Sequence, residues 1–131
     1  QRAANQGYAE AQYNLGVMYR HGQGVRQDYA EAVELYQLAA NQGYAIAQNN
    51  LGAMHEKGHG VQQDYTKAVE FYQLAANQGY AIAQNNLGMV YYTGQGVHQN
   101  YATAKTWFGK ACAGGDQLGC NNYRNVEQMG Y

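Results

Sequence analysis

The chain has 131 residues, of which 46% are hydrophobic and 13% charged, and its formal net charge is −1. This length is enough for one domain with its own core, and the near-neutral charge argues against electrostatic binding to nucleic acid or to an anionic membrane. The sequence has no apolar run long enough for a transmembrane helix, shows no signal peptide, and contains neither proline nor serine.

The sequence repeats itself with a period of 36 residues, and segment 37–52 recurs letter for letter as 73–88. A period of about 20 to 50 residues is typical of stacked repeat arrays. The aligned positions are Gly7, Gly43, Gly79 and Gly115; Leu15, Leu51 and Leu87; Gly16, Gly52 and Gly88; and Tyr29, Tyr65 and Tyr101. We therefore predict one domain over 1–131, with full repeats over 8–43, 44–79 and 80–115.

Residues 1–7 align with the end of a second helix, as in Ala39-Ala40-Asn41-Gln42, so the sequence opens on the end of a preceding repeat. An open solenoid end exposes apolar surface. Self-association of a second copy through this end is therefore one expectation.

Each full repeat is predicted to contain two helices. In the first repeat, Leu15, Met18 and Tyr19 lie on one side of a helix over 9–20, and the glycines around Gln23 end it. The second helix begins near Asp28, a good N-cap, and Glu31 three residues later predicts a capping box. It continues at helical spacing to the turn at 41–43. Nothing alternates like a strand, so the predicted fold is all-α.

A glycine recurs in the middle of each first helix, at Gly16, Gly52 and Gly88. Glycine costs about 1 kcal/mol relative to alanine there, so the repeated choice predicts close helix approach. We expect Ala32, Ala68 and Ala104 of the second helices to press against these glycines. We also expect Tyr29, Tyr36 and their equivalents to fill the spaces between neighbouring repeats.

The fourth repeat departs from the pattern after Gly115. Tyr123 takes the place of the leucine, Arg124 that of the mid-helix glycine and Glu127 that of the tyrosine. A charged, bulky residue at the close-contact position should exclude another helix. Residues 116–131 are therefore predicted as a C-terminal cap, with its helix over 116–128.

The repeat reads Ala-x-Ala-x-x-x-Leu-Gly-x-x-Tyr-x-x-Gly-x-Gly-Val over 9–25, and continues with Asp28-Tyr29-x-x-Ala32 and Tyr36-x-x-Ala39-Ala40. This pattern resembles the Sel-one-like repeat (SLR) family, a relative of the tetratricopeptide repeats, over about nine tenths of the chain. The resemblance implies a right-handed superhelical solenoid of helix-turn-helix repeats. His55 replaces the tyrosine of the pattern in the second copy.

The segments Lys110-Ala111-Cys112 and Gly119-Cys120 are similar to the signature of the cysteine-rich secreted members of this family. The resemblance implies a disulfide between Cys112 and Cys120, and with it a periplasmic or secreted bacterial protein. The alternative is a pair of buried free thiols.

The candidate catalytic and metal motifs do not predict chemistry. The Gly-x-Gly-Val segments follow helices and lack a Lys-Ser/Thr, so they are turns and not phosphate loops. His55 and His59 have the spacing of a zinc pair, but Gly58 should break the helix between them. Some cysteine-rich relatives carry β-lactamase or penicillin-binding labels, yet Ser-x-x-Lys needs a serine and His-x-His-x-Asp is absent. We predict no enzyme activity, no metal and no cofactor.

The three copies differ along one stripe of the first helix, which predicts a contact surface. This variable stripe comprises Tyr13, Val17, Arg20 and His21; Asn49, Ala53, Glu56 and Lys57; and Asn85, Met89, Tyr92 and Thr93. By resemblance to tetratricopeptide arrays it faces the concave side. Tyr13, Met89 and Tyr92 are the best anchor candidates, and neutral drift of exposed positions is the alternative.

Asn14, Asn50 and Asn86 lie beside the stripe in every copy. They predict an amide ladder for an extended peptide backbone or, alternatively, a structural role toward a neighbouring loop. The resemblance predicts a protein–protein interaction module, an exported adaptor that binds a partner protein or peptide. An immunity or inhibitor protein is the alternative, and a β-lactam-binding or cell-wall enzyme is a weaker one. Neither nucleic acid binding nor membrane insertion is expected.

Overall fold

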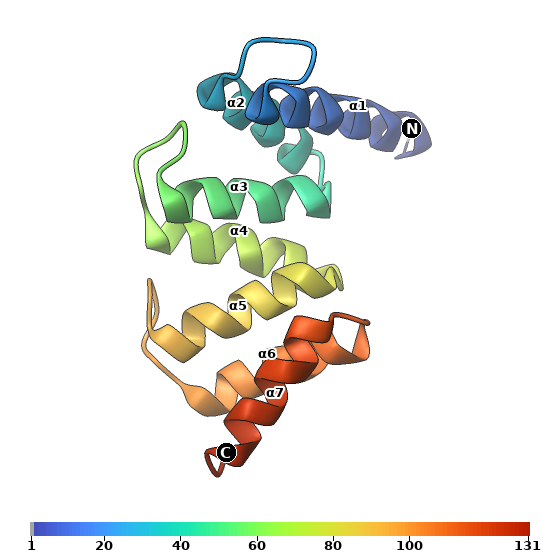
Figure 1. Ribbon diagram of the computed structural model, residues 1–131. Helices are drawn as coiled ribbons and strands as arrows, with labels where there is room; N and C mark the ends of the chain where they lie inside the picture. The colour runs from blue at the N-terminus through green and yellow to red at the C-terminus, as the bar shows by residue number, and fades with distance from the viewer. Residues whose placement is uncertain (1) are drawn as a thin grey trace.

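The computed structural model describes residues 2–131, with side chains described from Gly7 onward. These residues form seven α-helices and no strand: α1 (Arg2–His21), α2 (Tyr29–Asn41), α3 (Ala45–Lys57), α4 (Tyr65–Asn77), α5 (Ala81–Thr93), α6 (Tyr101–Ala113) and α7 (Gln117–Gln128). The helices stack in chain order, with α1 and α7 at opposite ends (Figure 1). Over the described residues, none of the helices has both the length and the apolar character of a membrane span.

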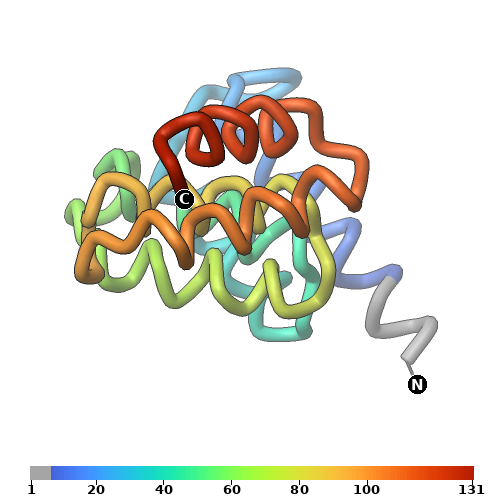
Figure 2. Tube along the Cα trace, turned by 90° about the horizontal axis from the view of Figure 1, so that it is seen from below, coloured from blue at the N-terminus to red at the C-terminus, as the bar shows by residue number. Residues whose placement is uncertain are grey.

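Each repeat contributes a first helix and a second helix to the stack. The first helices are α1, α3 and α5, the second helices are α2, α4 and α6, and α7 stands at the position of a fourth first helix. Helices that follow one another in the chain pack side by side, within a repeat and from one repeat to the next. Seen along the stack, they lie over one another (Figure 2). The molecule is therefore an all-α solenoid.

The second helices begin as the sequence predicts. The side chains of Asp28, Asp64 and Asn100 each accept a hydrogen bond from the backbone N–H three residues on, at 3.1, 3.1 and 2.9 Å. The capping box is only half formed, because the backbone N–H of Asp28 donates to the carbonyl oxygen of Tyr19 at 2.8 Å. This bond ties the start of each second helix to the end of its own first helix, and Asp64 and Asn100 repeat it.

The first helix is longer than predicted, since α1 begins at Arg2 and not near residue 9. Gly7 lies inside this helix, whereas its equivalents Gly43, Gly79 and Gly115 form turns with φ of +85°, +88° and +95°. The side chains of residues 1–6 lie outside the described residues. Their assignment to the end of a preceding repeat stays a prediction.

The mid-helix glycines are sites of close approach, but aromatic rings and not alanine side chains occupy the space. A Cβ at Gly52 would lie 2.9 Å from the ring of Tyr72, and one at Gly88 would lie 2.5 Å from the ring of Phe108. The backbone carbonyl oxygens of Ala68 and Ala104, at 3.1 and 3.2 Å, come next. The rings of Tyr36, Tyr72 and Phe108 are buried against these glycines inside their own repeats, and Tyr36 also shares a core cluster with Leu51 and Met54 of the next repeat, as predicted.

Neighbouring repeats meet through a core cluster and a turn. In the first cluster, Leu51 and Met54 of α3 pack with Tyr36 and Ala39 of α2. The turn after α3 lies against the start of α2: the rings of His59 and Tyr29 are 4.9 Å apart, and a Cβ at Gly60 would lie 2.6 Å from the carbonyl group of Tyr29. The expected role of Tyr29 between repeats is thus confirmed.

Candidate functional site

The variable stripe lies along α1, α3 and α5 and borders two hollows that share Met89. The first has a volume of about 190 Å³ and the second about 120 Å³. The first is lined by Glu56, Asn86, Met89, Val90, Thr93 and Gln95, and the second by Met89, Tyr92, Phe108, Asn122 and Asn125. The side chain of Met89 is 39% exposed between them, so an apolar, flexible side chain is available for contact at this point.

Most of the remaining stripe is also accessible. His21, Lys57 and Thr93 are exposed, and the side chains of Val17, Arg20, Ala53, Glu56 and Tyr92 are half-buried. The stripe therefore combines basic, acidic, aromatic and aliphatic groups on successive first helices. This mixture can contact a polypeptide through both apolar side chains and hydrogen bonds.

Two stripe residues do not belong to an accessible surface. Asn49 and Asn85 are only 5% and 6% exposed. The side-chain oxygen of Asn49 accepts a hydrogen bond from Asn86 Nδ2 at 2.9 Å, and that of Asn85 accepts one from Asn122 Nδ2 at 2.9 Å. Both amides join one first helix to the next and are buried, so the prediction that Asn49 and Asn85 lie on the contact surface was wrong.

The predicted amide ladder has a structural role, although its partners differ from those expected. Asn50 Nδ2 donates to the hydroxyl oxygen of Tyr13 at 3.1 Å, and Asn86 donates to Asn49. Each bond spans 37 residues and links side chains of consecutive first helices, so it does not satisfy a loop backbone. Asn14, at the same position in α1, is exposed.

Tyr13 is held mainly by packing inside the protein. Its ring stacks on Tyr36 with 5.5 Å between the centroids, and it lies 5.5 Å from the ring of Tyr44. Its hydroxyl also accepts the hydrogen bond from Asn50. Tyr13 is therefore less available than Met89 as an anchor for a partner.

Glu56 is the acidic group of the first hollow, and a buried tyrosine orients it. The hydroxyl of Tyr72 donates to Glu56 Oε1 at 2.5 Å. Burial, followed by this hydrogen bond and the charge of Glu56, raises the pKa of Tyr72 well above its ordinary value. Tyr72 therefore stays protonated and donates to Glu56, which leaves the other carboxylate oxygen as an acceptor for a partner.

Tyr92 forms a wall of the second hollow and connects α5 to the C-terminal segment. Its ring lies 5.1 Å from that of Tyr101 and 6.5 Å from that of Phe108. Its hydroxyl donates to the sulfur of Met129 at 3.7 Å. These contacts fix the ring and place a preorganised aromatic surface beside Met89.

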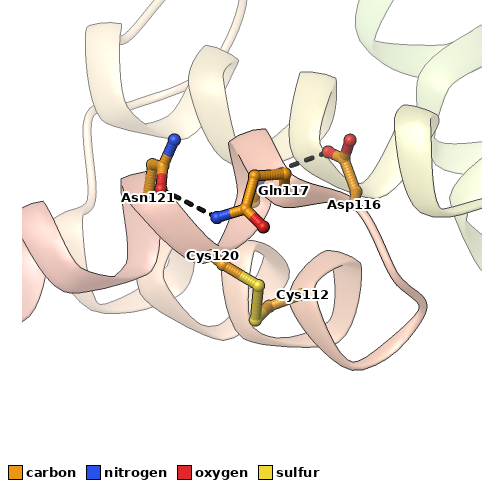
Figure 3. The surroundings of a disulfide bond; sticks show 6 residues. Cys112, Asp116, Gln117, Cys120 and Asn121 are labelled. Carbon is orange, nitrogen blue, oxygen red and sulfur yellow. Dashed lines mark hydrogen bonds between the residues drawn. A yellow bond between two sulfur atoms is a disulfide. The ribbon is translucent and has the colours of Figure 1, made fainter.

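The expected disulfide is present: Cys112 of α6 and Cys120 of α7 are bonded, with their Cα atoms 4.5 Å apart (Figure 3). In the preceding repeats, the two positions are occupied by alanine and glutamine, which make a hydrogen bond. Gln48 Nε2 donates to the carbonyl oxygen of Ala40, and Gln84 Nε2 to that of Ala76, both at 3.2 Å. The disulfide therefore replaces a hydrogen bond between a second helix and the next first helix.

The two histidines with zinc-pair spacing point to different neighbours. His55 is buried and stacks on Phe71 with 5.5 Å between the ring centroids, whereas His59 stacks on Tyr29. Over the described residues, no group of three or more His, Cys, Asp or Glu side chains is arranged to hold a metal ion.

Sequence reasoning missed three residues of the candidate site: Phe108, Asn122 and Asn125 line the second hollow. The period of 36 residues did carry a signal for Asn122, because this shift places it in line with Asn50 and Asn86. No comparable signal marked Asn125 or Phe108, since their place beside Met89 depends on how α6 and α7 pack against α5.

The comparisons with known proteins agree with this architecture. A search of curated proteins finds no match. Among solved structures, a protective antigen present in uropathogenic Escherichia coli strains, which displays an SLR fold, is 42% identical with a TM-score of 0.91, and the match covers 98% of this chain and 27% of that chain. A Sel1 repeat protein from Oxalobacter formigenes is 36% identical with a TM-score of 0.85, over 90% of this chain and 47% of that chain.

Helicobacter pylori cysteine rich protein B is 26% identical with a TM-score of 0.73, and the match covers 91% of either chain. The present chain thus spans about a quarter of the length of the Escherichia coli antigen and about half of the Oxalobacter formigenes protein. The family model of the Sel1 repeat matches residues 9–44, 45–80 and 81–116. The chain therefore belongs to the Sel1 repeat family.

Proposed function

We propose that this protein is a non-enzymatic binding module that holds a segment of a partner protein against the variable stripe, with Met89 at the centre of the contact. The observation that carries the proposal is the pair of adjoining hollows that share Met89. Interface energy concentrates in a few flexible or aromatic side chains surrounded by polar groups. Met89 and Tyr92 fit that description, with Glu56 and Asn125 at the rim.

The pattern of variation supports the same surface. The residues that hold the repeats together, such as Leu51 and Leu87 or Gly52 and Gly88, are the same from copy to copy. The accessible stripe positions change in size and charge, as in the half-buried Arg20, Glu56 and Tyr92. Each repeat thus offers different contacts on an unchanged framework, which suits a single partner bound across several repeats.

A site-specific photo-crosslinker tests the proposed surface. Incorporated at position 89, it should give a discrete adduct with a partner from the cells that make the protein. At position 74 it should not, although Leu74 on α4 is 50% exposed against 39% for Met89, because Leu74 lies outside the stripe. With the partner purified, Met89→Ala combined with Tyr92→Ala should weaken binding by about tenfold or more, and Leu74→Ala should leave it unchanged. Equal crosslinking at both positions, or equal affinities of all variants, would contradict the proposal.

We further propose that the protein acts outside the cytoplasm of a bacterium. The support is the Cys112–Cys120 disulfide, since such bonds persist in oxidising compartments and are rare in the cytosol. Alkylation of intact cells followed by mass spectrometry should find both cysteines unmodified until a reductant is added. Two freely alkylated thiols in the native compartment would place the protein in the cytosol.

A further inference from the structure

The first hollow contains an acidic group without a basic partner. Glu56 is the only charged side chain among the residues that line the two hollows. The hydroxyl of Tyr72 donates to Glu56 Oε1. No described basic side chain lies within ion-pair distance of the carboxylate, since the ion pair found among the described residues joins Lys105 to Glu127. The hollow is therefore lined by a negative charge that the described part of the protein leaves unpaired.

Other polar groups of the first hollow present hydrogen-bond acceptors. Asn86 Nδ2 donates to Asn49 at 2.9 Å, which leaves the carbonyl oxygen of the Asn86 amide as an acceptor. The hydroxyl of Thr93 donates to the backbone carbonyl oxygen of Met89 at 3.0 Å, which leaves its own lone pairs. A lysine ammonium or an arginine guanidinium carries several donors and no acceptor. Such a cation matches both the charge of Glu56 and these acceptors.

The second hollow, by contrast, is largely apolar. Asn122 Nδ2 donates to Asn85 at 2.9 Å and to the sulfur of Met89 at 3.7 Å, so the donors of this amide are already engaged. The rings of Tyr92 and Phe108 form walls of the hollow together with Met89, and no charged residue lines it. A single aliphatic side chain fits a volume of about 120 Å³ and gains by leaving water without burying an unpaired polar group.

We infer that the partner segment presents a lysine or arginine side chain to the first hollow and an aliphatic side chain to the second, two residues apart in an extended chain. Because the hollows share Met89, the two side chains lie on either side of it. Alternate side chains of an extended chain point to the same face and are about 7 Å apart, which leaves room for one side chain between them. This inference rests on the proposed function, because it assigns the chemistry of the partner bound at Met89.

The place of Glu56 in the array also sets the register of such a segment. Its equivalent in the first repeat is Arg20. A segment shifted by one repeat toward α1 would bring its basic residue beside this like charge. Specificity often combines an attractive contact with a repulsive one, and the stripe offers both at equivalent positions.

Selection of random peptides displayed on phage, with the 131-residue chain as the immobilised target, tests the inference without a known partner. The enriched peptides should carry Lys or Arg two residues from Leu, Ile, Val or Met, in either chain direction. The same selection on the Glu56→Gln variant should enrich the aliphatic residue without the basic one. Glutamine still accepts the hydrogen bond of Tyr72 but has no charge, so the variant keeps the internal contact and loses only the attraction.

The affinity of one selected peptide, labelled with a fluorophore and followed by anisotropy, gives a second readout. Glu56→Gln should weaken its binding by about tenfold. Glu70→Gln should leave the affinity unchanged, since it removes the same charge from an exposed position on α4 that lines neither hollow. A peptide with Gln in place of its basic residue should bind the parent protein and Glu56→Gln equally, because the interaction between the two charges is then absent from both complexes.

Enriched peptides without a basic residue, or equal affinities of the parent and Glu56→Gln for a peptide that has one, would overturn the inference. The double variant Met89→Ala with Tyr92→Ala then separates its failure from that of the proposed function. If this variant loses the peptides, the binding surface stands and only the assigned chemistry is wrong. If it keeps them, or if no peptide is enriched on the parent protein, the proposed function fails as well.

Discussion

At the mid-helix glycines, the absence of a side chain allows the two helices of a repeat to pack closely. At Gly88 there is no room for even a methyl group, because the ring of Phe108 occupies that space. The glycine weakens α5 as an isolated helix, but it lets α5 and α6 approach closely enough to bury the ring.

Gly88→Ala should therefore destabilise the protein despite the higher helix propensity of alanine. We expect the free energy of unfolding to fall by about 1–3 kcal/mol, the usual cost of overpacking a core, as measured by urea denaturation. Adding Phe108→Leu, which removes the ring that the methyl group meets, should recover part of that loss. A stability unchanged or raised by Gly88→Ala alone would show that α5 and α6 separate at little cost.

His55 is a buried titratable group whose Nδ1 atom has no hydrogen-bond partner among the described residues. Burial lowers the pKa of His55 below its ordinary value of 6.5, and the charge of Lys67 lowers it further, while Asp64 opposes the shift. The folded protein therefore binds a proton at His55 less readily than the unfolded chain does. At a pH above the ordinary histidine pKa, His55 is neutral in both the folded and the unfolded state. As the pH falls below that value, the unfolded state binds the proton first, so the free energy of unfolding decreases.

His55→Tyr introduces the residue found at the equivalent positions Tyr19 and Tyr91 and should remove this source of acid sensitivity. The urea midpoint of the parent protein should drop between about pH 7.5 and pH 5, and the drop should be smaller in the variant. An identical pH dependence of the two proteins would assign the acid sensitivity to other groups.

The sequence identified the residues of close approach but not what they touch. Glycine at a fixed helical phase shows that something packs tightly there, whereas the identity of the neighbour depends on the direction of side chains on the facing helix. Similarly, the equivalent positions Tyr13, Asn49 and Asn85 carry different residues, and this variation suggested that the position is exposed. The amides of Asn49 and Asn85 are buried because consecutive first helices pack side by side, which no feature of a single repeat reveals.

At the scale of elements, α7 is tied to the array by contacts that the repeats do not use. The disulfide joins it to α6, and Lys105 Nζ donates to the carbonyl oxygen of Tyr131 at 2.6 Å and lies 3.9 Å from Glu127 Oε2. Arg124 stands at the position where Gly52 and Gly88 admit an aromatic ring. We propose that α7 closes this end of the array, because the exposed, charged side chain of Arg124 leaves no place for the ring of a further second helix.

The exchange of a hydrogen bond for a disulfide can be reversed by substitution. Cys112→Ala with Cys120→Ala should lower the free energy of unfolding by about 2–3 kcal/mol, as the chain-entropy model gives for so short a loop. Cys112→Ala with Cys120→Gln restores the pair found at Ala40 and Gln48 and should recover about 1 kcal/mol. Equal stabilities of the two variants would show that the glutamine finds no carbonyl partner at the α6–α7 junction.

The elements themselves were largely predictable, and the exception is informative. The N-terminal caps of α2, α4, α6 and α7 follow from Asp and Asn, and the turns before α3, α5 and α7 follow from Gly, because the chemistry of these residues acts locally. The predicted start of α1 was wrong, because Gly7 is helical whereas its equivalents Gly43, Gly79 and Gly115 form turns. The disulfide was expected by resemblance, whereas its equivalence to the Gln48–Ala40 hydrogen bond became visible only in three dimensions.

At the scale of the whole molecule, the described contacts join neighbours in the stack and seldom reach farther. Stability in such an array is a sum of local terms, so damage at one end should stay there. Reducing the disulfide should therefore speed amide hydrogen exchange in α7 and the end of α6, while protection in α1 to α4 should hardly change. Mass spectrometry of exchanged peptides measures this, and faster exchange throughout the chain would show that the molecule unfolds as one cooperative unit.

The identity of segments 37–52 and 73–88, combined with contacts restricted to neighbours, has a consequence for how such genes change. Stretches of DNA that encode the same residues can misalign during recombination, and each such event adds or removes one complete unit of 36 residues. The new unit arrives with its turn glycine, its asparagine donor and its leucine already in phase with its neighbours. Array length in this lineage is therefore expected to change in whole steps without loss of folding, and selection can then act on the exposed stripe of each added copy.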